Sequence, residues 1–187
     1  TLQEAIEYKN KGFHVAAERK GKIVDGFDYG NSPLSYRNDK LKGETLVLTT
    51  TNGTKAINIA NDIEHLLIGS LLNLNAICKY LTDLNKSVLI LGSGWKNKFC
   101  LEDTICAGAI SEKLLKTNNF ESFNDSTIAA KYLYLSARTN FFGYLKASSH
   151  RKRLKKLNLN EDIKYCLTAN QTDVVPYRED YYLKKLS

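Results

Sequence analysis

The fold is decided by the stretch Leu46-Val47-Leu48-Thr49-Thr50-Thr51-Asn52-Gly53-Thr54. Its first residues are apolar and predict a buried strand, and a helix is expected to begin near Lys55. A hydroxyl-rich turn of this kind can bind an anion, because backbone N–H groups and the helix dipole point at the bound group. The same residue types also serve as ordinary helix caps, so the stretch alone leaves both interpretations open.

The composition fits one folded domain over residues 1–187. Hydrophobic residues make up 43% and charged residues 25%, which is enough apolar material for a core. The net charge is +7, and much of it lies in the run 150–156 and the pair Lys184-Lys185. Such a run can bind a polyanion, but it is most often a solvated helix face, and no known nucleic-acid motif is present. Nucleic acid is therefore not the expected partner.

Cysteine spacing and hydropathy indicate a cytoplasmic protein. Cys78, Cys100, Cys106 and Cys166 form no C-x-x-C pair, so we expect free thiols in a reducing compartment. No apolar run reaches the ~20 residues of a membrane span, and no signal peptide is recognisable. The chain lacks methionine and opens with the capping-box pattern Thr1-Leu2-Gln3-Glu4, from which we expect that N-terminal sequence has been lost.

Short apolar strands alternate with helices along the chain. Strands are expected at residues 13–17, 45–49, 65–68, 87–91 and 163–167, and helices at 1–11, 55–61, 73–84, 101–115, 125–135 and 142–157. This alternation predicts an α/β fold with three layers, α/β/α, around a mostly parallel sheet. In such folds ligands bind beyond the carboxyl ends of the strands.

Three of the predicted strands end in polar sequence. The first is followed by Glu18-Arg19, the second by the threonine turn, and the one at 87–91 by Gly92-Ser93-Gly94 and then Glu102-Asp103. Because these ends lie along one edge of a parallel sheet, we expect an arginine, an anion-binding turn and two adjacent acids to meet there. The segment after Gly92 does not match a P-loop, so a nucleotide-binding loop is not supported.

This combination suits phosphoryl chemistry. Arg19 suits bidentate recognition of phosphate, and Glu102 and Asp103 are hard oxygen ligands of the kind that Mg²⁺ prefers. Each group also has an ordinary explanation: Glu18 and Arg19 can form an ion pair at a strand end, and the acids can stabilise a helix start. His150 is a candidate general acid, an anion contact or a surface histidine.

Four motifs in this order resemble the 2-phosphosulfolactate phosphatase family. They are Glu18-Arg19, Gly26-Phe27-Asp28-Tyr29-Gly30-Asn31-Ser32-Pro33, the threonine turn, and Glu102-Asp103 with Ala107-Gly108. The resemblance as a whole covers nearly the entire chain. The resemblance implies a Mg²⁺-dependent acid phosphatase with an α/β fold. Such an enzyme removes phosphate from 2-phospho-3-sulfolactate to give sulfolactate, a step toward coenzyme M.

The resemblance places a defined set of residues around the site. The phosphate and substrate contacts are expected from Glu18, Arg19, Asn31, Ser32, Thr50, Thr51, Asn52, Gly53, Thr54 and, on chemical grounds, His150. Arg19, Glu102 and Asp103 are the expected catalytic residues, and the two acids are the expected Mg²⁺ ligands. The expected partner is a small anionic phosphoester, and a homodimer is compatible with the sequence.

Two departures from the family pattern stand out. Family members begin with an additional strand–helix unit, which contains an Asp and an Arg-Ala-Thr segment, and this chain begins after it. Lys20-Gly21 replaces a glycine pair that is usual in relatives. The alternative hypothesis is therefore a relative without catalysis that binds a phosphorylated or sulfonated metabolite.

Overall fold

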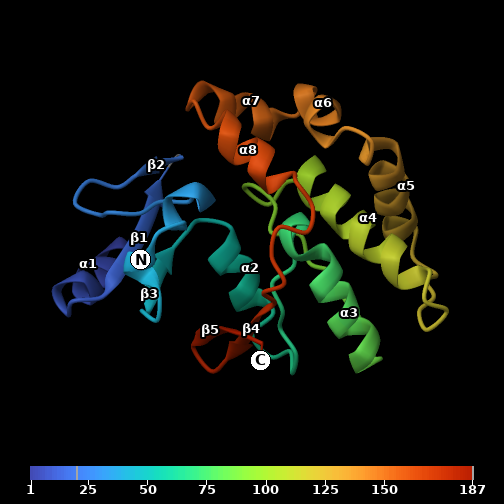
Figure 1. The fold of residues 1–187 in the computed structure, drawn as a ribbon, viewed down its shortest axis with the longest axis horizontal. Coiled ribbons are helices and arrows are strands. Elements are labelled where there is room, and N and C mark those ends of the chain that lie inside the picture. The colour runs from blue at the N-terminus through green and yellow to red at the C-terminus, as the bar shows by residue number, and fades with distance from the viewer. Residues whose placement is uncertain (20, 187) are drawn as a thin grey trace.

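The computed structural model describes residues 1–19 and 21–186, so Lys20, which the sequence singles out, lies outside the described residues. In Figure 1, strands β1–β3 and helix α1 lie at the left, and helices α3–α5 lie at the right. Helix α2 lies between these two groups, and α7 and α8 lie at the top. The helices are α1 (Leu2–Asn10), α2 (Gly53–Ile59), α3 (Leu74–Leu84), α4 (Leu101–Leu115), α5 (Asp125–Ala137), α6 (Phe141–Tyr144), α7 (Ser149–Lys156) and α8 (Asn160–Cys166). The strands are β1 (His14–Arg19), β2 (Lys22–Ile23), β3 (Leu46–Thr49), β4 (Pro176–Glu179) and β5 (Tyr182–Lys185). Four short 3-10 turns are η1 (Pro33–Tyr36), η2 (Asp39–Leu41), η3 (Leu71–Asn73) and η4 (Leu145–Ala147).

The strands form one small mixed sheet and one hairpin. In the sheet, of order β2-β1-β3, β1 and β3 are parallel with His14 opposite Leu46 and Ala17 opposite Thr49, and β2 is antiparallel to β1. Strands β4 and β5 form an antiparallel hairpin, and Tyr177 of β4 also makes an isolated antiparallel bridge to Leu67. The mixture of helices and strands is as predicted, but the three-layer arrangement around a mostly parallel sheet is not confirmed.

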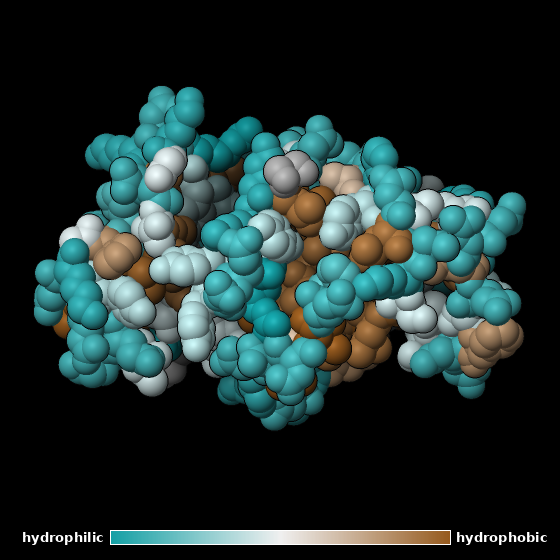
Figure 2. All heavy atoms as spheres, turned by 90° about the horizontal axis from the view of Figure 1, so that it is seen from below, coloured by the Kyte–Doolittle hydropathy of each residue, from teal (hydrophilic) through white to brown (hydrophobic). Residues whose placement is uncertain are grey.

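The predicted strand at residues 87–91 is extended chain without a partner strand in the described structure. Val88 and Ile90 pack against the main apolar cluster, whereas the side chain between them, Leu89, is 85% exposed. Apolar side chains also reach the surface in a band on the face drawn in Figure 2. The continuous apolar run that predicted a buried strand thus buries only alternate side chains, and the neighbour that would make it part of a sheet is not among the described residues.

Three other predictions about secondary structure need correction. Residues 65–68 make only an isolated bridge, in which Leu67 lies opposite Tyr177. The predicted helix 142–157 is divided, because Ser148 ends η4 in an extended conformation and its side chain caps α7. Residues 163–167 were predicted to be a strand and lie instead in helix α8 and its cap, whose first turn carries two acids that favour a helix start.

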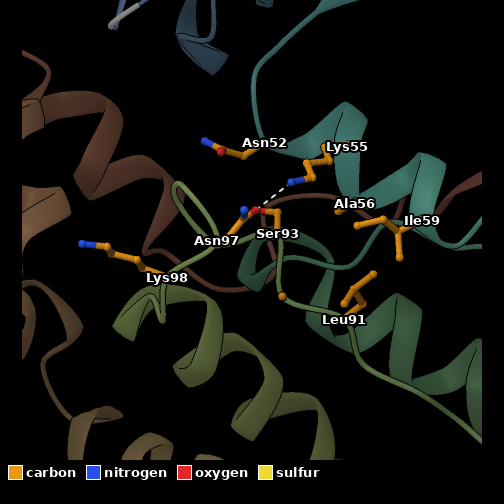
Figure 3. A pocket seen from close by; sticks show the side chains of 10 residues that line it. Asn52, Lys55, Ala56, Ile59, Leu91, Ser93, Asn97 and Lys98 are labelled. Atoms are coloured by element: carbon orange, nitrogen blue, oxygen red, sulfur yellow. Dashed lines mark hydrogen bonds between the residues drawn. The ribbon is translucent and has the colours of Figure 1, made fainter.

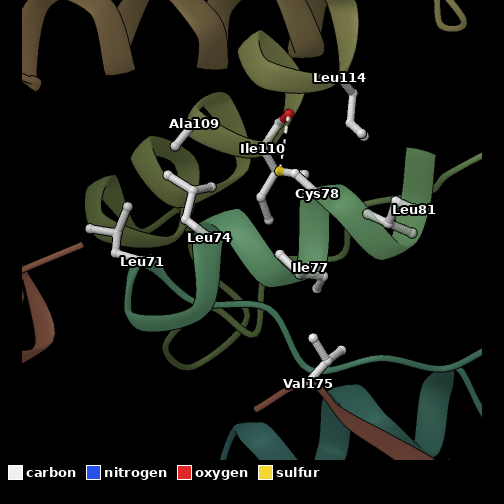
Figure 4. Packing of buried hydrophobic residues seen from close by; sticks show 9 residues of the cluster. All are labelled: Leu71, Leu74, Ile77, Cys78, Leu81, Ala109, Ile110, Leu114 and Val175. Atoms are coloured by element: carbon white, nitrogen blue, oxygen red, sulfur yellow. Dashed lines mark hydrogen bonds between the residues drawn. The ribbon is translucent and has the colours of Figure 1, made fainter. Parts of the chain in front are cut away.

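The main core lies between α3 and α4 (Figure 4). It contains Leu71, Leu74, Ile77, Cys78 and Leu81 from the η3–α3 segment, Ala109, Ile110 and Leu114 from α4, and Val175 from the C-terminal segment. On the opposite side of α4, Gly108 lies directly against the backbone of Ala130 in α5. These contacts hold α4 on both sides, and α4 carries the two candidate acids in its first turn.

No helix in the described part of the chain is both long enough and apolar enough to cross a membrane.

Candidate functional site

The threonine turn is braced by its own side chains. Thr50 Oγ1 accepts a hydrogen bond from the backbone N–H of Thr54 at 3.2 Å, and Thr54 Oγ1 donates to the Thr50 carbonyl at 2.9 Å. The Thr54 hydroxyl therefore donates within the turn, whereas the Thr50 hydroxyl accepts there and keeps its own hydrogen for another acceptor. Thr51 is exposed, and Gly53 begins α2, which has only seven residues.

Asn52 precedes α2 and contributes no side-chain cap to it. Its Oδ1 accepts instead from the backbone N–H of Lys96 at 3.4 Å, a residue of the loop that precedes α4. The Asn52 side chain thus ties the turn to a loop far along the chain, whereas Thr50 ties it to α2.

Arg19 lies at the end of β1, next to the end of β3. Its guanidinium donates to the backbone carbonyl of Glu18 at 2.7 Å and to Thr49 Oγ1 at 3.4 Å. The carboxylate of Glu18 accepts from the backbone N–H of Gly21 and from Asn31 Nδ2, the latter at 2.9 Å. The Glu18 side chain therefore closes a loop, and Arg19 reaches toward the threonine turn.

Asn31 and Ser32 have different roles in the structure. Asn31 is bound to Glu18 near the end of β1, whereas the hydroxyl of Ser32 donates to Asp162 at the start of α8. Ser32 consequently links the second motif to the C-terminal helices, and its hydroxyl is occupied by a protein partner.

The two adjacent acids point to different partners. Asp103 Oδ2 accepts the backbone N–H of Gly94 at 2.6 Å, with Ser93 Oγ at 3.5 Å. Glu102 Oε1 lies 2.6 Å from His150 Nδ1 in α7, and these side chains are 23% and 34% exposed. Although the two atoms are close, Glu102 Oε1 has no aligned hydrogen-bond donor, so the contact is an ion pair when the imidazole is charged.

The pKa values of the two acids shift in opposite directions. Burial raises the pKa of Asp103, and the charge of Glu102 adds to this, although the Gly94 N–H acts against it. Burial also raises the pKa of Glu102, but the contact with His150, its own backbone N–H and the Cys100 thiol outweigh burial, so its pKa lies below the ordinary value. The site therefore holds one carboxylate that ionises readily beside one that resists ionisation.

The structure offers a partial fit to Mg²⁺. Glu102 Oε1 is a buried carboxylate oxygen without an aligned donor, which is the state of an oxygen that could bind a cation. Within residues 1–19 and 21–186 no group of three or more His, Cys, Asp and Glu side chains is placed to hold a metal ion. Mg²⁺ needs only one or two carboxylates and keeps several waters, so the acid pair suits this ion better than a metal with a full protein cage.

The loop at residues 92–98 joins the turn to the acids. It contacts Asn52 through Lys96, it accepts a hydrogen bond from Lys55 Nζ at Asn97 Oδ1 at 2.7 Å, and it donates to Asp103 through Gly94. The structure thus brings together the turn, Asp103 and, through Glu102, His150.

A cavity of about 280 Å³ lies between α2 and this loop. Figure 3 shows Lys55 reaching across it to Asn97, with Leu91 and Ile59 close together at its other end. The sequence analysis included neither Lys55 nor Asn97 in the site. The position of Lys55, directly after the threonine motif, was the only signal for it, and the contact of Asn97 depends on the folding of a distant loop.

Fold and site together define an α/β protein with a threonine-rich turn, a nearby arginine and two partly buried acids. The chain belongs to the 2-phosphosulpholactate phosphatase family, a family of phosphoric monoester hydrolases, whose profile matches residues 1–181. This result confirms the resemblance seen in the motifs.

Three relatives illustrate the similarity, and each is named a probable 2-phosphosulfolactate phosphatase. The protein of Caldanaerobacter subterraneus is 40% identical over 179 residues, which are 94% of this chain and 74% of the relative. The protein of Cyanothece sp. is 41% identical, over 87% of this chain and 68% of the relative. That of Synechocystis sp. is 42% identical, over 86% and 68% respectively.

Proposed function

We propose that this protein hydrolyses 2-phospho-3-sulfolactate, or a closely related small phosphoester, to sulfolactate and phosphate with the help of Mg²⁺. In this reaction the ester P–O bond breaks, the oxygen of water takes its place on phosphorus, and the released alkoxide takes up a proton. The observation that carries the proposal is the connection from the threonine turn through the 92–98 loop to Asp103, in a chain of this family.

The positively charged groups of the site have a clear role in this reaction. Arg19 stands beside the turn and offers a planar cation to phosphate oxygens. The net charge of +7 favours the approach of a substrate that carries several negative charges. Donors are also available from the exposed Thr51, from the backbone of the turn and from the Thr50 hydroxyl, whereas the Thr54 hydroxyl already donates to the Thr50 carbonyl.

The acids are the proposed Mg²⁺ ligands. Glu102 offers a buried oxygen without an aligned donor, and Asp103 lies next to it on the first turn of α4. The ion would supply charge neutralisation at the phosphate oxygens. His150 holds Glu102 in place from the other side through the contact described above.

Release of phosphate from 2-phospho-3-sulfolactate tests the proposal. We expect turnover that requires Mg²⁺ and that falls by about 100-fold or more in Asp103→Asn, the scale for loss of a group that stabilises developing charge. Lys79→Gln, which alters an exposed lysine paired with Asp83 on α3, is the matched control and should leave turnover unchanged. Metal-independent turnover would contradict the assignment of the acids.

A second candidate function is binding without catalysis. It is favoured by one observation: Asp103 is already engaged by Gly94, and the described residues contain no larger cluster of metal ligands. Tight binding of sulfolactate with no release of phosphate from its phosphoester would support this second function and reject the first.

We also propose that the protein acts in the cytoplasm. All four cysteines are free thiols, as expected in a reducing compartment.

A further inference from the structure

The cavity between α2 and the 92–98 loop is lined by cations, hydrogen-bond donors and apolar groups. Its lining residues are Asn52, Lys55, Ala56, Ile59, Leu91, Gly92, Ser93, Gly94, Asn97 and Lys98. This set contains two lysines and no aspartate or glutamate. A concave site with positive charge and no carboxylate favours an anionic ligand.

The two asparagines keep their amide donors because their oxygens are already bound. Asn52 Oδ1 accepts from the backbone N–H of Lys96, and Asn97 Oδ1 accepts from Lys55 Nζ. Each amide therefore has its NH₂ group left for a ligand. Lys55 uses one of its three N–H donors in this contact and retains two, together with its full charge.

The loop that forms the far wall is preorganised. Lys96 and Asn97 have positive φ angles of 53° and 56°, and the backbones of Trp95 and Lys98 pair across them, as in a tight hairpin turn. Gly94, with φ of 64°, donates to Asp103, which fixes the base of the turn. A wall held in this way loses little conformational entropy when a ligand binds.

The cavity adjoins the acids. Gly92 and Ser93 line it, and a Cβ on Gly92 would lie 3.4 Å from Asp103 Cβ. A small molecule whose phosphate is held at the turn and the acids would extend its remaining groups into this space. The apolar end, with Ile59 and Leu91, suits a short carbon chain, and the end with Lys55 suits a charged group.

We propose that this cavity is the subsite for a second anionic group of the substrate, a sulfonate or a carboxylate, with Lys55 as its counter-charge. The inference rests on the proposed function, because it assumes that a phosphoester is cleaved beside the cavity. It goes further in assigning substrate selectivity to Lys55 and Asn97, together with Asn52 at the edge of the turn.

Four phosphoesters separate the two anionic groups. 2-Phospho-3-sulfolactate carries both, 2-sulfoethyl phosphate carries only the sulfonate, 2-phospholactate carries only the carboxylate, and ethyl phosphate carries neither. The value of kcat/KM is measured for each ester with the wild type, with Lys55→Gln and with the control Lys79→Gln. Thermal melting of each variant verifies that it is folded.

In Lys55→Gln we expect kcat/KM to fall by about 10-fold for esters with the second anion, mainly through KM, because a lost charge contact typically changes affinity by this order. Ethyl phosphate should change by less than about 2-fold. A loss confined to the sulfonate esters assigns the subsite to sulfonate, and a loss confined to the carboxylate esters assigns it to carboxylate. An equal loss for all four esters, or no loss for any, overturns the proposal.

Direct binding keeps the two proposals separate. If no ester is hydrolysed, the proposed function fails, and calorimetric titration with 3-sulfolactate and with lactate then tests the subsite alone. Binding of 3-sulfolactate that weakens by about 10-fold in Lys55→Gln and not in Lys79→Gln supports the subsite. Binding that is equal in both variants, or absent in the wild type, overturns it.

Discussion

Replacing Gly108 by alanine tests how closely α4 and α5 must pack to hold the acids in place. A Cβ on Gly108 would lie 2.0 Å from the carbonyl oxygen of Ala130 and 2.9 Å from Tyr134 Cβ. Because an ordinary contact begins near 3.4 Å, the helices would have to separate by about 1.4 Å. The obstacle is mainly backbone, so no side-chain rotation relieves it.

The expected effect follows from two opposing contributions. Overpacking a well-packed core costs about 1–3 kcal/mol, and here the rigid obstacle places the cost at the upper end. Alanine is favoured over glycine inside a helix by about 1 kcal/mol. We therefore expect Gly108→Ala to lower the free energy of unfolding by about 2 kcal/mol, which for a chain of this size lowers Tm by about 4–8 °C.

Urea denaturation followed by far-UV circular dichroism measures this change. Gly53→Ala is the matched control, because its Cβ would meet only Thr50 Oγ1 at an ordinary 3.4 Å. The control should be neutral or slightly stabilising. If Gly108→Ala were as stable as the wild type or more stable, helix propensity alone would govern the site, and the inferred close packing of α4 on α5 would be wrong.

Three further predictions concern α4. Because Ile105 is fully buried, Ile105→Ala should lower the free energy of unfolding, measured by urea denaturation, by about 2–5 kcal/mol. A loss under about 1 kcal/mol would contradict its burial. Because the folded state lowers the pKa of Glu102, its ionised form stabilises the fold above the ordinary pKa. Glu102→Gln should therefore be less stable than the wild type at pH 7, and the difference should shrink as the pH falls below the ordinary pKa. A constant difference in stability across pH 3–7 would reject this prediction. Because the folded state raises the pKa of Asp103, the wild type loses stability as the pH rises through the folded pKa. The stability of Asp103→Asn relative to the wild type should therefore increase between pH 4 and pH 7 in thermal melts. A decrease in this relative stability would reject the pKa shift.

Local sequence signals predicted several elements well. Thr1 and Glu4 form the capping box of α1, and the helix that carries the acids has the predicted bounds, 101–115. The parallel pairing of the first strand with β3 also agrees with the prediction. These features depend on contacts near in sequence or on a continuous apolar pattern, both of which a single sequence contains.

Long-range pairing was harder to predict. Residues 87–91 form the continuous apolar run of a buried strand, but strand formation also requires a neighbour, and the described structure supplies none. Residues 163–167 contain too few positions to separate alternation from helical spacing, and the acids before Ile163 favour the helix. Each error concerns a short segment whose state depends on distant parts of the chain.

In the candidate site, too, the sequence predicted the residue types but not their partners. Glu102 and Asp103 were identified from their residue types and motif, but their partners, His150 and Gly94, are set by the positions of α7 and the 92–98 loop. Thr50 and Thr54 were predicted to contact phosphate; in the structure the Thr54 hydroxyl already donates within the turn, whereas the Thr50 hydroxyl accepts there and keeps its own hydrogen. Residue type therefore indicates which groups can act, and tertiary contacts decide which of them are free to do so.

The central claim is that the turn, the loop and the acids form one phosphatase site. The most direct test follows 2-phospho-3-sulfolactate by ³¹P NMR in the presence of the wild-type protein, first with Mg²⁺ and then with excess EDTA. The account predicts that the ester signal is replaced by that of inorganic phosphate with Mg²⁺ and persists with EDTA. An ester signal that persists in both conditions, or disappears equally in both, would contradict it.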